Sequence, residues 1–175
     1  MRNLAEKWSK APDWQDAVIE APGLKIGSVS GLHQRLVSGD LAAWAAASGF
    51  DGTAVGAFGQ AEGIRYSVRL ARDRLLAVST TPLGIATGWH SQGFAVTEIS
   101  AGLHIFDVSG EAVDAFVARG TTLDPKQAGA SAALSFAGID AIVYRHGTTL
   151  RIHVDRGLAA YLWTWMENAA RNIRA

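Results

Sequence analysis

The stretch that most constrains the fold lies near the C-terminus and reads Asp155-Arg156-Gly157-Leu158-Ala159-Ala160-Tyr161-Leu162-Trp163-Thr164-Trp165-Met166. Asp is a common first residue of helices, and the aromatic and aliphatic residues after it recur at helical spacing, so we expect a closing helix here. At about 100° per residue, the apolar positions on one face are Leu158, Tyr161, Leu162, Trp165, Met166 and Ala169, with Ala159 and Trp163 at its edge. This face spans an arc of about 200°, roughly twice what one core contact needs, so the helix is predicted to pack against two neighbours.

The two neighbours involve different residues of this face. The residues assigned to the protein's own core are Leu158, Leu162, Trp165 and Ala169. Trp163, at the edge of the arc, is predicted to contact a partner, together with Trp8 and Trp14 of the N-terminal segment. If Trp163 were buried within its own chain, the helix would no longer indicate a partner.

Length and charge limit the classes of function that the chain can have. With 175 residues it can form one compact domain or two packed lobes. Its 16 basic and 16 acidic residues cancel, which disfavours nucleic acid and membrane surfaces as partners. There is no cysteine, which excludes disulfides and thiolate catalysis and suits a reducing compartment. Because no signal peptide or membrane-spanning run is visible, we expect a cytoplasmic protein.

A strand–helix–strand pattern runs twice along the chain. Residues 1–22 are predicted to form an N-terminal arm, and residues 23–175 a single folded unit of two lobes, about 23–92 and 93–175. The order strand, helix, three strands recurs at an offset of about 70 to 76 residues, which is typical of a duplicated unit. The predicted fold class is therefore α+β, with two similar lobes of strands and packed helices.

The elements expected in each lobe follow from alternation, caps and turns. For the first lobe they are strands at 24–30, 53–58, 64–70 and 74–78 and a helix between Asp40 and Gly49. For the second lobe they are strands at 94–99, 103–108, 132–136, 141–144 and 149–154, a helix capped by Ser109 that ends at Gly120, and the closing helix after Asp155.

Motifs of common enzyme classes are missing. None of the 19 glycines is followed two positions later by another, so there is no G-x-G-x-x-G dinucleotide fingerprint. The segment 27–31 has the glycine spacing of a nucleophile elbow but carries Val29 where the nucleophile must stand. We therefore predict no catalytic residue in this chain and no metal-binding set.

Two histidines and one group of cationic and aromatic residues are the remaining candidates. His104 and His153 lie on predicted neighbouring strands and, with Asp107 or Asp155, form either a metal or acid/base site or a pair of partly buried histidines satisfied by backbone groups; we favour the second interpretation. The residues that we consider for binding an anionic ligand are Arg65, Arg69, Trp89 and Arg145, although a solvated sheet face would explain Arg65 and Arg69 equally well.

Residues 96–170 resemble the gamma subunit of heterotetrameric sarcosine oxidase, which is related in fold to the folate-binding glycine-cleavage aminomethyltransferase. The resemblance includes Val96-Thr97-Glu98-Ile99-Ser100, the segment 103–110, Thr121-Thr122-Leu123-Asp124-Pro125 and the strands before the closing helix. Its most specific part is Tyr161-Leu162-Trp163-Thr164-Trp165, where the family has Tyr-Leu-Trp-x-Trp. The family often has cysteine where Thr121 or Thr122 stands here.

The resemblance implies a two-lobed α+β fold and a non-catalytic subunit that helps to assemble a folate-linked amine-oxidising complex. Flavin and NAD would then be held by larger flavoprotein subunits, and this chain would be their partner. The folate-contacting acidic residues of the aminomethyltransferases have no counterpart in this sequence. Two alternatives stay open: a free-standing binder of folate or another one-carbon carrier, and a homo-oligomeric structural protein.

Overall fold

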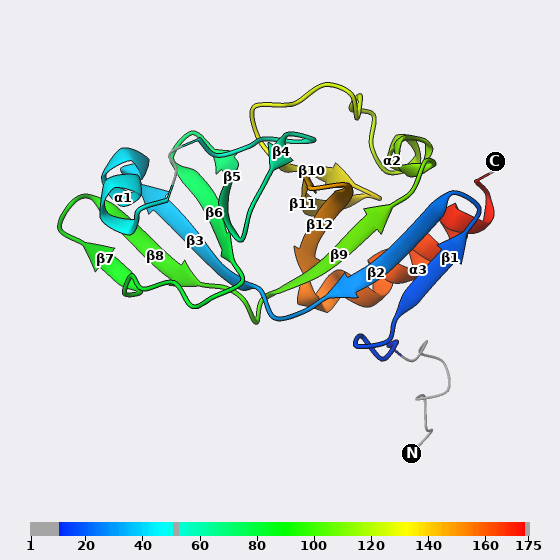
Figure 1. The fold of residues 1–175 in the computed structure, drawn as a ribbon, viewed down its shortest axis with the longest axis horizontal. Helices are drawn as coiled ribbons and strands as arrows, with labels where there is room; N and C mark the ends of the chain where they lie inside the picture. The colour runs from blue at the N-terminus through cyan, green and yellow to red at the C-terminus, as the bar shows by residue number, and fades with distance from the viewer. Residues whose placement is uncertain (1–10, 51–52, 174–175) are drawn as a thin grey trace, which may run out of the picture.

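The computed structural model describes residues 11–50 and 53–173, which form two antiparallel sheets and three α-helices (Figure 1). The elements of the first half are β1 (Val18–Ala21), β2 (Leu24–Val29), β3 (His33–Gly39), α1 (Leu41–Ser48), β4 (Gln60–Ala61), β5 (Arg65–Ala71), β6 (Arg74–Ser79) and β7 (Gly88–His90). Those of the second half are β8 (Phe94–Glu98), β9 (Leu103–Ser109), α2 (Val113–Gly120), β10 (Ala133–Phe136), β11 (Ile139–His146), β12 (Thr149–Asp155), a 3-10 turn at Arg156–Leu158 and α3 (Ala159–Arg171).

The chain passes between the two sheets at β2–β3 and at β8–β9, and the short β4 takes it briefly back to the first sheet between β3 and β5. The seven-stranded sheet has the order β1-β2-β9-β12-β11-β10, with the short β4 paired in parallel to β11. The five-stranded sheet has the order β5-β6-β3-β8-β7. Because β2 leads into β3 of the other sheet and β8 leads back into β9, the hairpin β1–β2 pairs with β9 in one sheet and the hairpin β7–β8 pairs with β3 in the other. The strand that precedes a helix, β3 or β9, lies beside that hairpin in both sheets.

Alternate side chains of each strand point to opposite faces of a sheet, and this places the sheets in the middle of four layers. In β6, Leu75 and Ala77 pack with Trp44 of α1, whereas Leu76 and Val78 face the other sheet and join a cluster that includes Tyr144. Figure 1 shows α1 at one end of the molecule and α2 and α3 at the other. The layer order is therefore α1, five-stranded sheet, seven-stranded sheet, α2 with α3.

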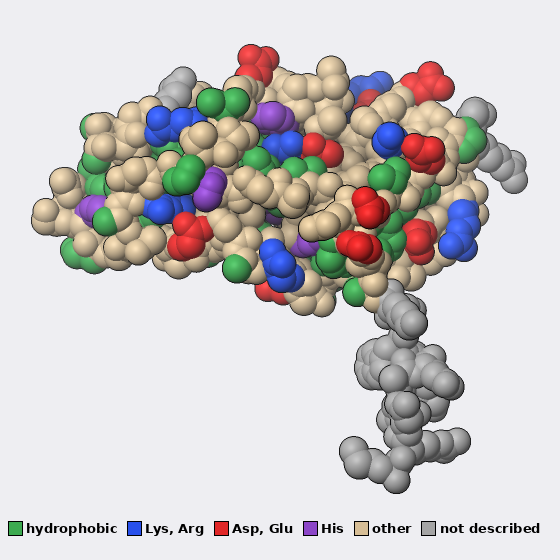
Figure 2. Space-filling view, turned by 60° about the horizontal axis from the view of Figure 1, so that its bottom comes forward, with side chains coloured by type: hydrophobic (Ala, Val, Ile, Leu, Met, Phe, Trp, Pro, Cys, Tyr) green, Lys and Arg blue, Asp and Glu red, His purple; other side chains and the backbone are tan. Residues whose placement is uncertain are grey.

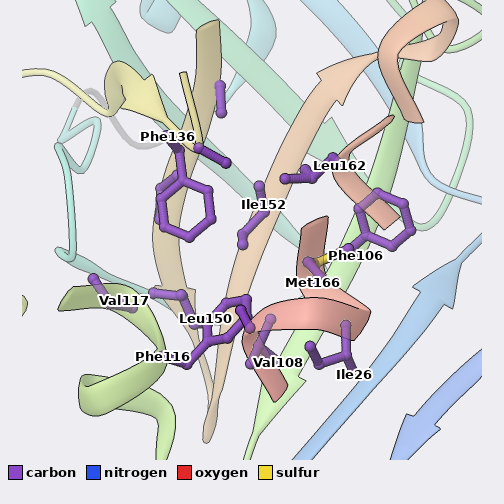
Figure 3. Packing of buried hydrophobic residues seen from close by; sticks show 14 of the residues in the cluster. Ile26, Phe106, Val108, Phe116, Val117, Phe136, Leu150, Ile152, Leu162 and Met166 are labelled. Carbon is purple, nitrogen blue, oxygen red and sulfur yellow. The ribbon is translucent and has the colours of Figure 1, made fainter. Parts of the chain in front are cut away.

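The largest core lies between the seven-stranded sheet and its two helices (Figure 3). Phe116 of α2 and Met166 of α3 have no exposed surface there and pack against sheet residues such as Phe106 and Ile152. Burying a side chain of this size contributes about 1.5–3 kcal/mol relative to leaving it in water. The core thus holds α2 and α3 on one face of the sheet and leaves the other face for contact with the five-stranded sheet.

Most of the predicted elements are present, and the exceptions have local causes. Asp40 accepts hydrogen bonds from the first turn of α1, and Gly49 ends that helix at φ 67°, as expected. Ser109 does not cap α2, because β9 continues through it and the helix begins after Ala112 without a side-chain cap. The strand expected at 53–58 reduces to one isolated bridge between Val55 and Val68.

Four strands were not predicted: β1, β3, the two-residue β4 and β7. The segment 18–21, which falls within the predicted N-terminal arm, forms β1 and pairs with β2. The central strand β3 has too many polar residues to show apolar alternation, although its Gln34 and Val37 are buried. Residues 1–10 of the predicted arm, including Trp8, lie outside the described residues.

The described surface carries dispersed charge. Figure 2 shows Lys and Arg side chains interspersed with Asp and Glu over one face of the molecule. Among residues 11–50 and 53–173, no helix has the length and apolar character that a membrane crossing requires.

Candidate functional site

Strand β12 places two polar side chains between the sheets. Its residues Leu150, Ile152 and Val154 belong to the helix-covered core, so Arg151 and His153 point to the opposite face, toward the five-stranded sheet. Both faces of this strand are covered, and its Arg151 and His153 are 7% and 0% exposed. A buried charge and a buried imidazole both need partners, and these two residues are the start of a candidate site.

The charge of Arg151 is neutralised by Asp107 of the adjacent strand β9. The two residues are cross-strand neighbours, and the guanidinium binds the carboxylate in a bidentate fashion, Nε to Oδ1 and Nη2 to Oδ2, both at 2.7 Å. Burial alone would lower the pKa of Arg151, but its hydrogen bonds with Asp107 raise it instead. The guanidinium is therefore charged at every physiological pH and is held in a fixed orientation.

A chain of hydrogen bonds leads from Arg151 across the interface and ends at Gln34 of the five-stranded sheet. Arg151 Nη1 donates to Tyr66 Oη at 2.7 Å, and Tyr66 Oη lies 2.9 Å from Tyr144 Oη. Tyr144 Oη lies 2.8 Å from Nε2 of His153, whose Nδ1 lies 2.7 Å from Gln34 Oε1. The chain joins β5 and β3 of one sheet to β11 and β12 of the other.

The guanidinium of Arg151 at one end and the amide oxygen of Gln34 at the other are consistent with a single direction for every bond in this chain. A guanidinium only donates, so Tyr66 accepts from Arg151 and uses its own proton toward Tyr144. Tyr144 then donates to Nε2 of His153, which leaves the proton of the neutral imidazole on Nδ1, where it is donated to Gln34. The ring is thus the Nδ1-protonated tautomer, and the amide of Gln34 is oriented with its oxygen toward it.

Protonation of His153 would break this order. Nε2 would then carry a proton toward Tyr144, and the hydroxyl protons of Tyr144 and Tyr66 could not both find an acceptor in the chain. Consistent with this, burial first and the charge of Arg151 second lower the pKa of His153 to about 3. Burial also raises the pKa of Tyr66 and of Tyr144, so both keep their protons.

This chain can orient groups and join the sheets, but it has no group that exchanges protons near neutral pH. A fully satisfied buried network rigidifies its surroundings, whereas loss of one member leaves the others unpaired. Within residues 11–50 and 53–173, no three His, Asp or Glu side chains are arranged to hold a metal ion. The arrangement therefore favours a structural role for these residues.

The two candidate histidines do not meet. In the register of β9 and β12, His104 lies opposite Val154 and His153 opposite Ile105, so the two rings are on opposite faces of the sheet. The metal or acid/base interpretation is therefore wrong. Each ring has its own partner, as the alternative expected, although the partners are side chains: His104 Nε2 lies 3.0 Å from Ser28 Oγ.

The four residues considered for an anionic ligand lie in separate places. Arg65 and Arg69 are on β5 and Trp89 on β7, at opposite edges of the five-stranded sheet, and Arg145 is in the other sheet. Arg145 forms an ion pair with Asp114 at 2.9 Å, and Arg65 lies over the ring of Phe50 at 4.6 Å. The structure does not bring these side chains together around one cavity.

Two of the three tryptophans assigned to a partner interface, Trp14 and Trp163, pack against each other. Trp163 is 6% exposed, and its ring centroid lies 5.8 Å from that of Trp14 and 5.7 Å from that of Phe106. Trp163 therefore gives no reason to expect a partner. The exposed apolar residues near the start of the closing helix are Leu158, at 40%, and Tyr161, at 50%, although Leu158 had been assigned to the core.

The members of the buried chain were mostly missed from the sequence. Asp107 and His153 were singled out, but for a different chemistry, and Arg151, Tyr66, Tyr144 and Gln34 were not. The available signal was the direct opposition of Asp107 and Arg151 on adjacent strands. Opposite charges on two adjacent strands whose other face is apolar are compatible with a face that another sheet covers and equally with a face that meets solvent.

Comparison with known proteins places this fold. No protein-family model matches the chain, and no curated protein matches its sequence. A structure of heterotetrameric sarcosine oxidase from Corynebacterium sp. U-96, in complex with pyrrole 2-carboxylate, contains a chain that superposes with a TM-score of 0.69 at 18% identity. The match covers 90% of this chain and 89% of that chain. The protein therefore shares its fold with a chain of a heterotetrameric sarcosine oxidase, as the resemblance predicted.

Proposed function

We propose that the protein is a non-catalytic subunit that helps to assemble a sarcosine-oxidase-like complex. The observation that carries the proposal is the match to a chain of a heterotetrameric enzyme over nearly the whole length of both chains. In such a complex, flavin and NAD belong to larger flavoprotein subunits. This chain supplies a rigid body to which they attach.

The buried polar chain supports this role. It uses the ionisable groups Arg151, Asp107 and His153 to fix the two sheets relative to each other. A subunit that positions other chains needs such rigidity, because relative motion of its two sheets would also move the subunits bound to them. The proposed surface for a partner is the apolar groove at the ends of β10, β11 and β12, which includes Ile139, Ile142 and the exposed Leu158.

Co-purification with candidate partners tests the proposal. The chain is expressed with a tag together with candidate flavoprotein subunits, and the flavin absorbance of the affinity eluate is measured against the amount of tagged chain. A stoichiometric yellow complex is expected. Elution of the tagged chain alone, colourless and folded by circular dichroism, would contradict the proposal.

Matched variants then test the proposed groove. Leu158 and Val18 are exposed to similar degrees, 40% and 49%, but lie in different parts of the surface. Leu158→Glu should reduce the recovered flavin at least tenfold, because a charge in an apolar contact must be desolvated. Val18→Glu should leave it unchanged, and equal losses in both variants would remove the groove from the proposal.

The two-lobed duplication remains a proposal that the strand orders support. The orders β5-β6-β3-β8-β7 and β11-β12-β9-β2-β1 correspond position by position. In each, a hairpin, a strand, a helix and a second hairpin follow one another along the chain, and the first hairpin pairs with the other copy. We propose that an ancestral unit was duplicated and that the copies exchanged hairpins.

Two other functions predict different outcomes of simple measurements. A free-standing binder of tetrahydrofolate should give a one-to-one calorimetric titration, and a flat trace would dismiss it; the separation of Arg65, Arg69, Trp89 and Arg145 gives this alternative no common site. A homo-oligomeric structural protein should have a solution mass that is a multiple of the monomer in the absence of flavoprotein.

A further inference from the structure

A small pocket lies where the chain crosses between the sheets, apart from the groove proposed for a partner. Its volume is about 190 Å³, and its walls come from the end of β2, the first residues of β3 and β9, and the segment after β12. The polar side chains that line it are Gln15, Ser28, Ser30, Gln34, Ser100, His104 and Arg156. Trp14, Leu32 and Leu103 add apolar surface.

The pocket carries a single formal charge, and it is positive. Arg156 is its only charged lining residue, and its guanidinium has no acceptor among residues 11–50 and 53–173. No carboxylate lines the pocket. The other ionisable wall group, His104, stays neutral near pH 7 because burial first and the charge of Arg156 second lower its pKa. The electrostatics therefore favour a ligand with one negative charge.

The buried chain prepares a second donor at this site. Gln34 is 2% exposed and lines the pocket, and its amide oxygen is occupied by the Nδ1 proton of His153. Its amide nitrogen has no hydrogen-bond acceptor within the described residues. With its oxygen bonded to His153, the amide is not free to present that oxygen to the pocket instead. The pocket therefore faces a preoriented donor, which accepts an anionic oxygen without reorganisation.

We propose that this pocket binds a small organic monocarboxylate, with one carboxylate oxygen held by Arg156 and the other by the amide nitrogen of Gln34. The volume is below the roughly 300–1,000 Å³ of pockets for drug-sized ligands, so the ligand has few heavy atoms. Its apolar body lies against Trp14, Leu32 and Leu103. The two groups proposed to hold the ligand, the guanidinium of Arg156 and the amide nitrogen of Gln34, both donate, so they select an acceptor.

Titration of the full-length protein with acetate, propionate and acetamide, followed by NMR, tests the site. Acetate and propionate should give saturable shifts of the His104 ring and of the Gln34 side-chain amide, and propionate should bind more tightly because it buries one more methylene. Bound carboxylate should also raise the pKa of His104, because a negative charge beside it favours imidazolium. Acetamide has the same shape without the charge and should give no saturable shift.

Variants separate this site from general attraction of anions to the surface. Arg156 is exposed, so Arg156→Met leaves the core intact and should weaken propionate binding about 10- to 100-fold, the range for one charge-assisted hydrogen bond. Arg72→Met, at an exposed turn between β5 and β6, is the matched control and should bind as the wild type does. Shifts that do not saturate, equal losses in both variants, or equal binding of acetamide would each overturn the proposal.

Discussion

The neutral state of His153 makes a quantitative prediction for the pH dependence of stability. In the folded protein the pKa of this ring is lowered to about 3 from an ordinary value of 6.5, first by burial and then by Arg151. Between these values the unfolded chain takes up a proton that the folded protein does not. Stability must therefore fall as the pH falls through 6.5, and the loss continues until about pH 3.

The size of this effect follows from the two pKa values. One proton taken up only by the unfolded state changes the free energy of unfolding by about 1.4 kcal/mol per pH unit. From pH 7 to pH 5 the loss due to His153 is about 2 kcal/mol, because the unfolded ring titrates over the first part of this range. The full effect, reached near pH 3, is about 5 kcal/mol, a large part of the 5–15 kcal/mol that is typical of a domain.

Urea unfolding at pH 5, 6, 7 and 8 measures this directly for the wild type and His153→Gln. The variant lacks the titrating ring, so the stability gap between the two proteins should narrow by about 2 kcal/mol from pH 7 to pH 5. The pKa of His104 is also lowered by burial, but this residue is present in both proteins, so its contribution to stability cancels in the difference.

Parallel stability curves for the wild type and His153→Gln would refute the assigned direction of the hydrogen-bond chain. If the variant does not fold, the NMR titration of the wild type decides the question without it. The ring of His153 should show the Nδ1-protonated tautomer and no titration above pH 5. A midpoint near 6.5 would be incompatible with a neutral imidazole that Tyr144 must donate to.

Three further predictions concern packing and satisfaction of buried groups. Tyr144→Phe removes the hydroxyl that links a buried ring nitrogen to a buried phenol, and urea unfolding should show a loss of about 1–3 kcal/mol. Trp163→Ala should cost about 3–5 kcal/mol because that ring is 6% exposed, whereas Trp89→Ala, at 73% exposure, should change stability by less than about 0.5 kcal/mol. Gly120→Ala places a Cβ 2.4 Å from a buried phenylalanine ring and should lower Tm, with a loss of about 1–3 kcal/mol, while Gly84→Ala has open space and should not.

How far the sequence predicts this fold depends on whether one face of an element meets water. Helix α1 was placed to the residue because Asp40 and Gly49 have local roles that need no knowledge of the rest of the chain. The hairpin β11–β12 was predicted from its apolar alternation and turn. Strand β3 was not, because its buried positions include Gln34, and a polar residue at a covered position breaks the pattern on which such predictions rest.

The candidate site was hidden for the same reason, and its hydrogen bonds span too much of the chain to be inferred locally. Gln34 and His153 are 119 residues apart, and Arg151 and Tyr66 are 85 apart. Alternation distinguishes apolar from polar positions, but it does not distinguish a polar face that meets water from one that another sheet covers. In this protein each strand at the interface carries one or two polar residues, and burying them without hydrogen-bond partners would cost free energy. These polar residues find their hydrogen-bond partners only when the two sheets come together. The network is therefore a property of the assembled fold and not of any single segment.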